Sequence, residues 1–126
     1  MNKILIIEDK IARFVELELR HEGYDTAKAG DGRTGLDMAE TGEYDLVVLD
    51  IMLPQLSGIE VLRRLRKSAN AAAANVPVIL LTAKSEEYDK IGGYHSGADD
   101  YVVKPFSPKE LMLRIEAVMR RSSRER

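Results

Sequence analysis

The sequence predicts one α/β domain in which helices cover both faces of a parallel sheet. Two observations carry this prediction. Short apolar runs of strand length alternate five times with segments of helical periodicity. The runs, such as KILII at 3–7 and LVVL at 46–49, are apolar throughout, so neither face of their sheet can lie in water. We expect right-handed crossover connections between the strands.

The composition excludes several classes of protein. A chain of 126 residues, 44% hydrophobic and 32% charged, has the size of one compact domain with its own core. The net charge of −2 provides no basic field for binding nucleic acid. Because cysteine is absent, disulfides, thiolate metal sites and a cysteine nucleophile are excluded. Glu8 and Asp9 end the N-terminal apolar run too early for a signal peptide or membrane span, so we expect a cytoplasmic protein.

The first half of the chain is expected to hold three strands and two helices. A stripe of apolar residues at helical spacing begins at Ile11, and Gly23 is a good helix stop. Asp31 can cap a second helix, which ends near Gly42. The strands are expected at 3–7, 24–29 and 46–50.

A third helix and a short insertion follow the strand that ends at residue 50. Ser57 can cap this helix. Its basic residues are interpreted as a solvated face. They are Arg63, Arg64, Arg66 and Lys67. The segment SANAAAAN at 68–75 either prolongs the helix or forms a loop.

The rest of the chain supplies two more strands and two more helices. The strands are expected at 76–81 and 100–103, with a helix at 85–95 between them. Gly92 and Gly93 each cost that helix about 1 kcal/mol relative to alanine, so it should be the least stable one. The last helix begins at Ser107, with Pro108 at its first position.

Four of the five expected strands end in charged or hydroxyl-bearing residues. In an open parallel sheet, the carboxyl ends of the strands form the edge at which ligands bind. Taken singly, each of these residues has an ordinary structural explanation, but their joint occurrence at one edge indicates a site. The residues are Glu8, Asp9, Asp50, Thr82 and Lys104.

The residue types at this edge suit phosphoryl transfer. Three carboxylates repel one another, and Mg²⁺ would resolve this because it binds one or two carboxylates together with waters and a phosphate. An aspartate carboxylate can attack phosphorus to form an aspartyl-phosphate. We therefore expect Asp50 to attack, Mg²⁺ and Lys104 to neutralise the transferred group, and the Thr82 hydroxyl to donate to the product.

Four motifs in order resemble the receiver domain of two-component response regulators. They are IIED, VVLDIMLPQLSG, ILLTA and GADDYVVKPFSPKEL, and the match is closest to the winged-helix (OmpR/PhoB-type) DNA-binding subfamily. The resemblance implies a flavodoxin-like (CheY-like) five-stranded parallel sheet with order 2-1-3-4-5, flanked by five helices. It also implies that a sensor histidine kinase donates the phosphoryl group.

The resemblance assigns roles to single residues. Asp50 is the phosphoacceptor, and Lys104 binds the phosphate and is joined to Pro105 by a cis bond. Thr82 and Tyr101 form the switch. The metal ligands are Glu8, Asp9, Asp50 and the backbone carbonyl of Met52. Lys10 departs from the family pattern, because an acid is frequent at that position.

The resemblance also implies a dimer and a missing effector. We expect phosphorylation to favour a homodimer through the helix at 85–95, the strand at 100–103 and the last helix. The cross-subunit pairs would be Lys90–Glu110, Asp100–Arg114 and Asp99–Arg121. Residues 1–120 would form the receiver domain, and 121–126 would start a linker to a DNA-binding domain absent from this chain. Transcription would be controlled through that domain.

Three other functions remain to be weighed. A phosphatase that uses an aspartate nucleophile typically needs an acid two residues later, where this chain has Met52, so only slow autodephosphorylation is expected and not conventional enzyme turnover. A flavodoxin would need a glycine- or hydroxyl-rich phosphate cradle after the first strand, and here that loop is acidic. A pseudo-receiver would bind partners without accepting phosphate, and the complete set of acids, hydroxyl and lysine argues against it.

Overall fold

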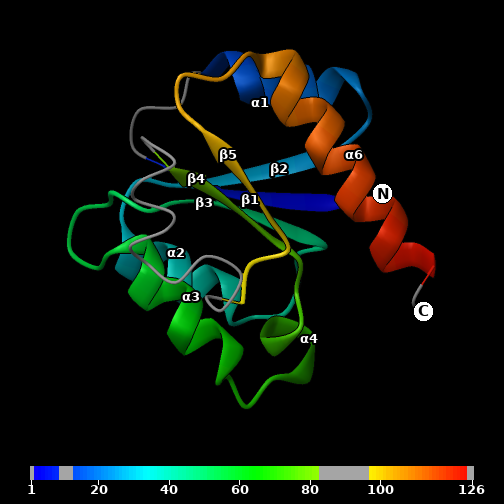
Figure 1. The fold of residues 1–126 in the computed structure, drawn as a ribbon. Coiled ribbons are helices and arrows are strands. Elements are labelled where there is room, and N and C mark those ends of the chain that lie inside the picture. Colours follow the sequence, from blue (N-terminus) through cyan, green and yellow to red (C-terminus); the bar gives the residue numbers. More distant parts are fainter. Residues whose placement is uncertain (1, 9–12, 83–96, 125–126) are drawn as a thin grey trace.

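The computed structural model describes residues 2–8, 13–82 and 97–124, and their central element is a parallel sheet (Figure 1). The strand order is 2-1-3-4-5, as expected. Every neighbouring pair is parallel, which confirms the predicted fold class. The strands are β1 (Lys3–Ile7), β2 (Asp25–Ala29), β3 (Leu46–Asp50), β4 (Val78–Thr82) and β5 (Asp100–Val103).

Helices cover both faces of the sheet. In Figure 1, α1 and α6 lie above it and α2, α3 and α4 lie below it. The described helices are α1 (Arg13–His21), α2 (Gly32–Ala39), α3 (Gly58–Arg66), α4 (Ala71–Ala74) and α6 (Pro108–Arg124). No helix in the described ranges is both long and apolar enough to cross a membrane.

The sheet divides the core into two halves. Along β1, Leu5 and Ile7 pack in the half that contains α2 and α3, whereas Ile4 and Ile6 pack in the half that contains α1 and α6. Side chains of successive strand residues point to opposite faces, so an apolar run with no polar gaps fills both halves. All five residues of β3 are buried, which confirms the interpretation of this run as a central strand.

The SANAAAAN insertion forms a separate short helix. The Oδ1 atom of Asn70 accepts hydrogen bonds from the backbone of Ala72 and Ala73, at 3.0 and 3.3 Å, and caps α4. The Asn70 Nδ2 donates to the carbonyl of Thr41, 3.1 Å away, and Ala73 is buried in the core. The insertion therefore packs against the domain instead of prolonging α3.

The last helix is longer than expected. A linker was expected from residue 121, but α6 continues through Arg124. Polar composition does not end a helix by itself, and the stretch from Arg120 to Arg124 contains neither glycine nor proline. The helix expected at 85–95, with Lys90, Gly92 and Gly93, lies outside the described residues.

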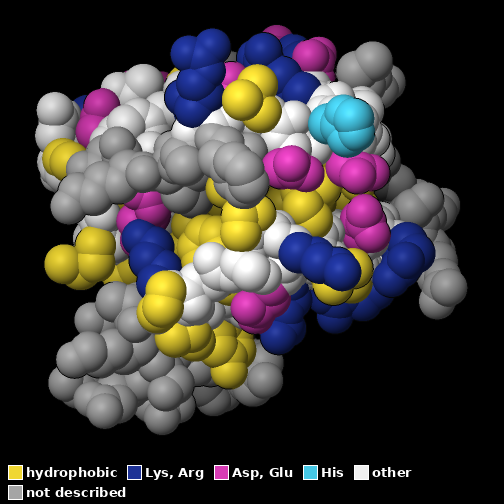
Figure 2. Space-filling view, turned by 90° about the horizontal axis from the view of Figure 1, so that it is seen from above, with side chains coloured by type: hydrophobic (Ala, Val, Ile, Leu, Met, Phe, Trp, Pro, Cys, Tyr) yellow, Lys and Arg dark blue, Asp and Glu magenta, His cyan; other side chains and the backbone are white. Residues whose placement is uncertain are grey.

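The outer surface over α1 and α6 combines charged and apolar side chains. Figure 2 views the molecule from this side and shows Lys, Arg, Asp and Glu side chains around a strip of apolar ones. Leu113, on α6, has 56% of its surface exposed. A groove of about 500 Å³ lies here between α1 and α6.

The start of α3 is pressed against the end of β3. Ser57 caps the helix as expected, since its hydroxyl accepts from the backbone N–H of Glu60. The backbone N–H of Gly58 donates to the carbonyl of Ile51 at 2.9 Å. A Cβ atom on Gly58 would lie 2.0 Å from the backbone oxygen of Asp50. Only glycine fits here, and it lets α3 support the peptide group of the residue that ends β3.

We predict that Gly58→Ala destabilises the domain by about 1–3 kcal/mol, even though alanine is the better helix former. The reason is the clash with backbone, which cannot move without shifting Asp50. Gly30→Ala is the matched control because a Cβ at Gly30 meets nothing within 4 Å, and it should change stability by less than about 0.5 kcal/mol. Urea unfolding of both variants measures the difference, and equal stabilities would contradict the close approach.

Candidate functional site

Three polar side chains are buried at the carboxyl edge of the sheet. Glu8 follows β1, Asp50 ends β3 and Thr82 ends β4, with 5%, 3% and 0% of their surfaces exposed. Lys104 follows β5 and brings a cation to the two acids. Its Nζ lies 2.7 Å from Oδ2 of Asp50 and 2.9 Å from Oε2 of Glu8. The structure thus brings together four of the five residues predicted at this edge, and the fifth, Asp9, lies outside the described residues.

The strand register explains why a lysine can reach both acids. Strand β4 lies between β3 and β5, and Asp50 pairs with Leu81 while Thr82 pairs with Val103. The backbone N–H of Lys104 donates to the carbonyl of Thr82, so its side chain starts level with the end of β4. Its long side chain then spans β4 to reach the end of β3.

Two carboxylates share one ammonium group at this edge. Burial by itself lowers the pKa of Lys104, but the hydrogen bonds and charges of Asp50 and Glu8 outweigh this effect and raise the pKa above its ordinary value. Lys104 is therefore a cation throughout the physiological range. Among these three groups, negative charge exceeds positive charge by one.

The backbone after β3 orients the Asp50 carboxylate. Its Oδ1 accepts a hydrogen bond from the N–H of Met52 at 3.1 Å, while its Oδ2 faces Lys104. The Met52 side chain is 68% exposed. The carboxylate is thus held at both oxygens by groups of the protein itself, and its neighbour at residue 52 borders solvent.

The donor set fits a hard divalent cation. Two buried carboxylates with one unit of excess negative charge are the oxygen ligands that Mg²⁺ prefers. Within the described ranges, no three His, Cys, Asp or Glu residues form a group that could hold a metal ion. Asp9, the third carboxylate expected here, is not among the described residues. Glu8, Asp50 and Met52 are the described part of the expected metal site.

The two residues expected to act as a switch lie on neighbouring strands. Thr82 is completely buried at the end of β4, and Tyr101 stands opposite Leu80 in the register of β5 and β4. The Tyr101 ring is half-buried and packs against the core half that contains α2 and α3. Their assignment as a switch remains a prediction.

Members of the expected dimer pairs already contact each other within one chain. The guanidinium of Arg114 lies 3.2 Å from the carboxylate of Asp100. Arg121 donates to the backbone oxygen of Asp99, 3.4 Å away, and not to its carboxylate. Glu110 is exposed in the first turn of α6, and Lys90 lies outside the described residues. Whether these residues also pair across a dimer remains a prediction.

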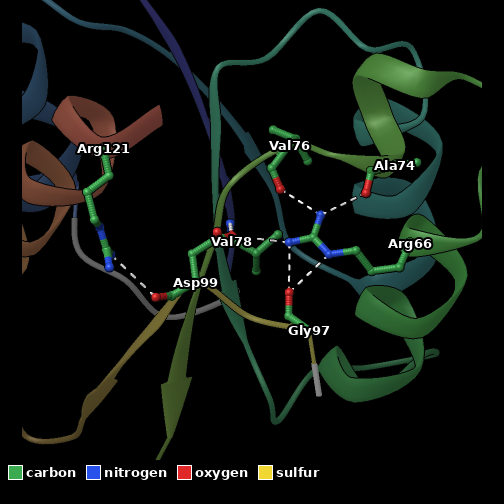
Figure 3. Close-up of polar contacts among 7 residues, drawn as sticks. All are labelled: Arg66, Ala74, Val76, Val78, Gly97, Asp99 and Arg121. Atoms are coloured by element: carbon green, nitrogen blue, oxygen red, sulfur yellow. Dashed lines mark hydrogen bonds and ion pairs between the residues drawn. The ribbon is translucent and has the colours of Figure 1, made fainter. Parts of the chain in front are cut away.

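The sequence interpretation is wrong for Arg66, which does not belong to a solvated basic face. Arg63 and Arg64 do lie at the surface, where their hydrogen bonds lower the pKa of Glu60 to about 2. Arg66 instead points into the molecule and binds four other residues (Figure 3). Burial lowers the pKa of its guanidinium, against the opposing effect of Asp99. The clue in the sequence was spacing: Arg66 follows the buried Leu62 by four residues and so shares its face.

Comparison with known proteins identifies the family. The family model for the response regulator receiver domain matches residues 4–116 of this chain. The chain belongs to this family. It is 50% identical over 123 residues to the response regulator ArlR of Staphylococcus saprophyticus. That match covers 96% of this chain and 54% of ArlR, so the receiver domain described here spans about half the length of this relative.

Solved receiver domains share the fold. One from a Francisella response regulator is 40% identical with a TM-score of 0.85, and the match covers 97% of this chain and 99% of that one. Another, from a sensor histidine kinase of Pseudomonas aeruginosa, is 32% identical with a TM-score of 0.79, and the match covers 94% and 97%. The latter protein holds a magnesium ion in its active-site cleft.

The raised pKa of Lys104 predicts a loss of stability at alkaline pH. A lysine whose pKa is higher in the folded state adds stability that is fully present below the unfolded pKa of about 10.4 and is lost as pH rises through the folded pKa. Above about pH 10.4 the wild type should therefore lose stability faster than Lys104→Arg, whose guanidinium stays charged.

Thermal unfolding from about pH 9 to pH 11.5 measures this difference. Lys109→Arg, at an exposed position in the first turn of α6, is the matched control and should follow the wild type at every pH. If Lys104→Arg also followed the wild type in parallel, the ion pairs of Lys104 would not contribute to stability in the way described.

Proposed function

We propose that this receiver domain accepts a phosphoryl group from a sensor histidine kinase onto Asp50. The observation that carries the proposal is the buried Asp50 carboxylate, held between the Met52 N–H and the Lys104 ammonium beside a second acid, Glu8. The family of the chain supports this role. In keeping with the sequence, we place this activity in the cytoplasm.

In the proposed transfer, an oxygen of Asp50 forms the new bond to phosphorus while the bond from phosphorus to the kinase histidine breaks. The histidine nitrogen keeps the bonding electrons and takes up a proton. The Lys104 ammonium would move from the carboxylates to an oxygen of the transferred group, and the Thr82 hydroxyl would donate to another. Both groups stabilise charge that Asp50 alone could not hold in a buried site.

A magnesium ion fits this mechanism. Glu8, Asp9, Asp50 and the carbonyl of Met52 would hold it, and when bound it supplies positive charge that neutralises the phosphoryl oxygens. The related receiver domain from Pseudomonas aeruginosa, with magnesium in its active-site cleft, supports this assignment. Glu8 and Asp50 also offer buried carboxylate oxygens, the ligands that Mg²⁺ prefers, which supports the assignment independently.

We propose the groove between α1 and α6 as the docking surface for the kinase. It is lined by Ser107 and Pro108, which closely follow Lys104, and by the apolar side chains of Met112 and Leu113. The nearness of Ser107 and Pro108 to Lys104 along the chain is the reason for this assignment. A kinase helix seated there would lie beside the site that receives its phosphoryl group.

Phosphorylation would change the domain through Thr82 and Tyr101. One hydrogen bond to a charged group contributes about 1.5–3 kcal/mol, whereas a nearly complete population switch needs about 5.5 kcal/mol. The Thr82 contact is too weak alone, so Lys104, Mg²⁺ and the association of two activated domains would supply the rest. We therefore propose a phosphorylation-favoured homodimer through β5, α6 and the segment before β5.

The output is proposed to be control of transcription. The curated relatives are about twice as long as this chain, which leaves room in them for an effector of domain size. In our proposal, a DNA-binding domain follows the last helix, and the dimer sets the spacing of two such domains. Conventional enzyme turnover is not part of the proposal, since Met52 occupies the position where phosphatases of this chemistry carry an acid.

We predict that incubation with Mg²⁺ and acetyl phosphate adds one phosphoryl group to the chain, measured as intact-protein mass. The addition should disappear in Asp50→Ala and when Mg²⁺ is omitted, because the nucleophile or the neutralising cation is then missing. Asp37→Ala, which removes an exposed aspartate of α2, is the matched control and should be phosphorylated like the wild type. If no phosphoryl group appeared with any donor, including a matched kinase, the domain would be an interaction module.

We predict that Arg114→Glu weakens dimerisation of the phosphorylated chain at least about tenfold. The change places an acid near Asp100, and two-fold symmetry introduces it twice in one interface. Arg33→Glu, an equal charge reversal at an exposed position of α2, is the control and should leave the dimer unchanged. Sedimentation of the phosphorylated variants measures the dimer, and unaltered dimerisation of Arg114→Glu would rule out this face.

A further inference from the structure

Arg66 ties four segments together at the edge of the sheet opposite to the phosphoacceptor site. Its guanidinium donates to the carbonyl of Gly97 from Nε and Nη2, at 3.0 and 2.9 Å. From Nη1 it donates to the carbonyls of Ala74 and Val76, at 3.1 and 2.6 Å. Nη2 also lies 3.2 Å from Oδ2 of Asp99 (Figure 3). One side chain of α3 thereby joins the end of α4, the approach to β4 and the approach to β5.

Asp99 is the only acidic residue among these contacts. The hydrogen bonds that hold its carboxylate meet at Oδ2. Its Oδ2 accepts from Arg66 and from the backbone N–H of Val78, which lies 2.8 Å away. Its own N–H donates to the carbonyl of Val78 at 2.9 Å. The Asp99 side chain nevertheless keeps 42% of its surface exposed. A carboxylate has about four acceptor positions, so the two bonds at Oδ2 leave capacity for another cation.

The surface around Asp99 suits a second copy of the same chain. It carries the acids Asp99 and Asp100 beside the cations Arg114 and Arg121. A face with both signs of charge can be complementary to itself about a two-fold axis. Arg121 reaches the backbone of Asp99 within the chain, so its guanidinium lies on the same surface as the carboxylate that it would meet in a second copy.

We propose that Arg66 is a positioning residue for the dimer, which holds the Asp99 carboxylate ready for Arg121 of a second copy. This inference rests on the dimerisation proposed above. Ordering a free side chain at an interface opposes binding, and a carboxylate that is already fixed avoids that cost. The contacts of Arg66 lie at the edge of the sheet away from the phosphoacceptor site, so in this proposal it acts through Asp99 and the Gly97–Asp99 backbone.

The test is a double-mutant cycle on the phosphorylated chain. In the wild-type background, Arg66→Gln should weaken the dimer by about two- to tenfold, the range expected for releasing one side chain. In the Arg121→Gln background the same change should have no further effect, because the partner of Asp99 is already gone. Arg66→Lys keeps the charge but not the planar guanidinium, and its dimer affinity should lie between those of Arg66→Gln and the wild type.

Two controls separate this role from a loss of folding or of phosphorylation. The extent of phosphorylation, read as intact mass, should be unchanged in Arg66→Gln and Arg66→Lys, since the site lies at the other edge of the sheet. The second control compares the loss of dimer affinity caused by Arg66→Gln in the wild-type background with the loss in the Arg121→Gln background. An equal loss in both backgrounds would show that Arg66 merely stabilises the fold, and a tighter dimer in Arg66→Gln would show that Arg66 competes with the partner. Either result overturns the inference. If the phosphorylated wild type stays monomeric, the proposed dimer itself is wrong, and the inference falls with it.

Discussion

The interaction on which the site depends is the contact of one ammonium group, that of Lys104, with the carboxylates of Asp50 and Glu8. Two ionised carboxylates are costly to bury side by side unless a cation reaches both. The cation follows β5, which is not adjacent to β3, so β1, β3, β4 and β5 must come together before the acids are compensated. The apolar runs that build the sheet are therefore also what makes the charged cluster possible.

Much of the fold could be predicted because each part of the sequence follows a simple rule. The strands are apolar on both faces, which predicts a parallel sheet covered on two sides, and β3 is completely buried as expected. The ends of the strands then predict the site. The positions of four site residues can be predicted from the direction of the strands alone, and the structure places all four at one edge. They are Glu8, Asp50, Thr82 and Lys104.

The features that could not be predicted depend on contacts between distant segments. The partners of Arg66 are mostly backbone carbonyls, which every residue has, so no pattern in the sequence identifies them. The SANAAAAN segment became a helix because Asn70 caps it and also binds the carbonyl of Thr41 in another segment. Arg121 contacts the backbone of Asp99 within one chain, whereas the resemblance concerned only a pairing of the two side chains across a dimer.

The division of the core by the sheet has a consequence for the evolution of such a domain. Neighbouring residues of one strand, such as Leu5 and Ile6, belong to different halves and touch different helices. Changes in the lining under α1 and α6 can therefore accumulate without disturbing the half in which α3 supports the phosphoacceptor strand. A lineage can in this way acquire a new partner surface on one side while the chemistry, held by the other side and the strand ends, is inherited intact.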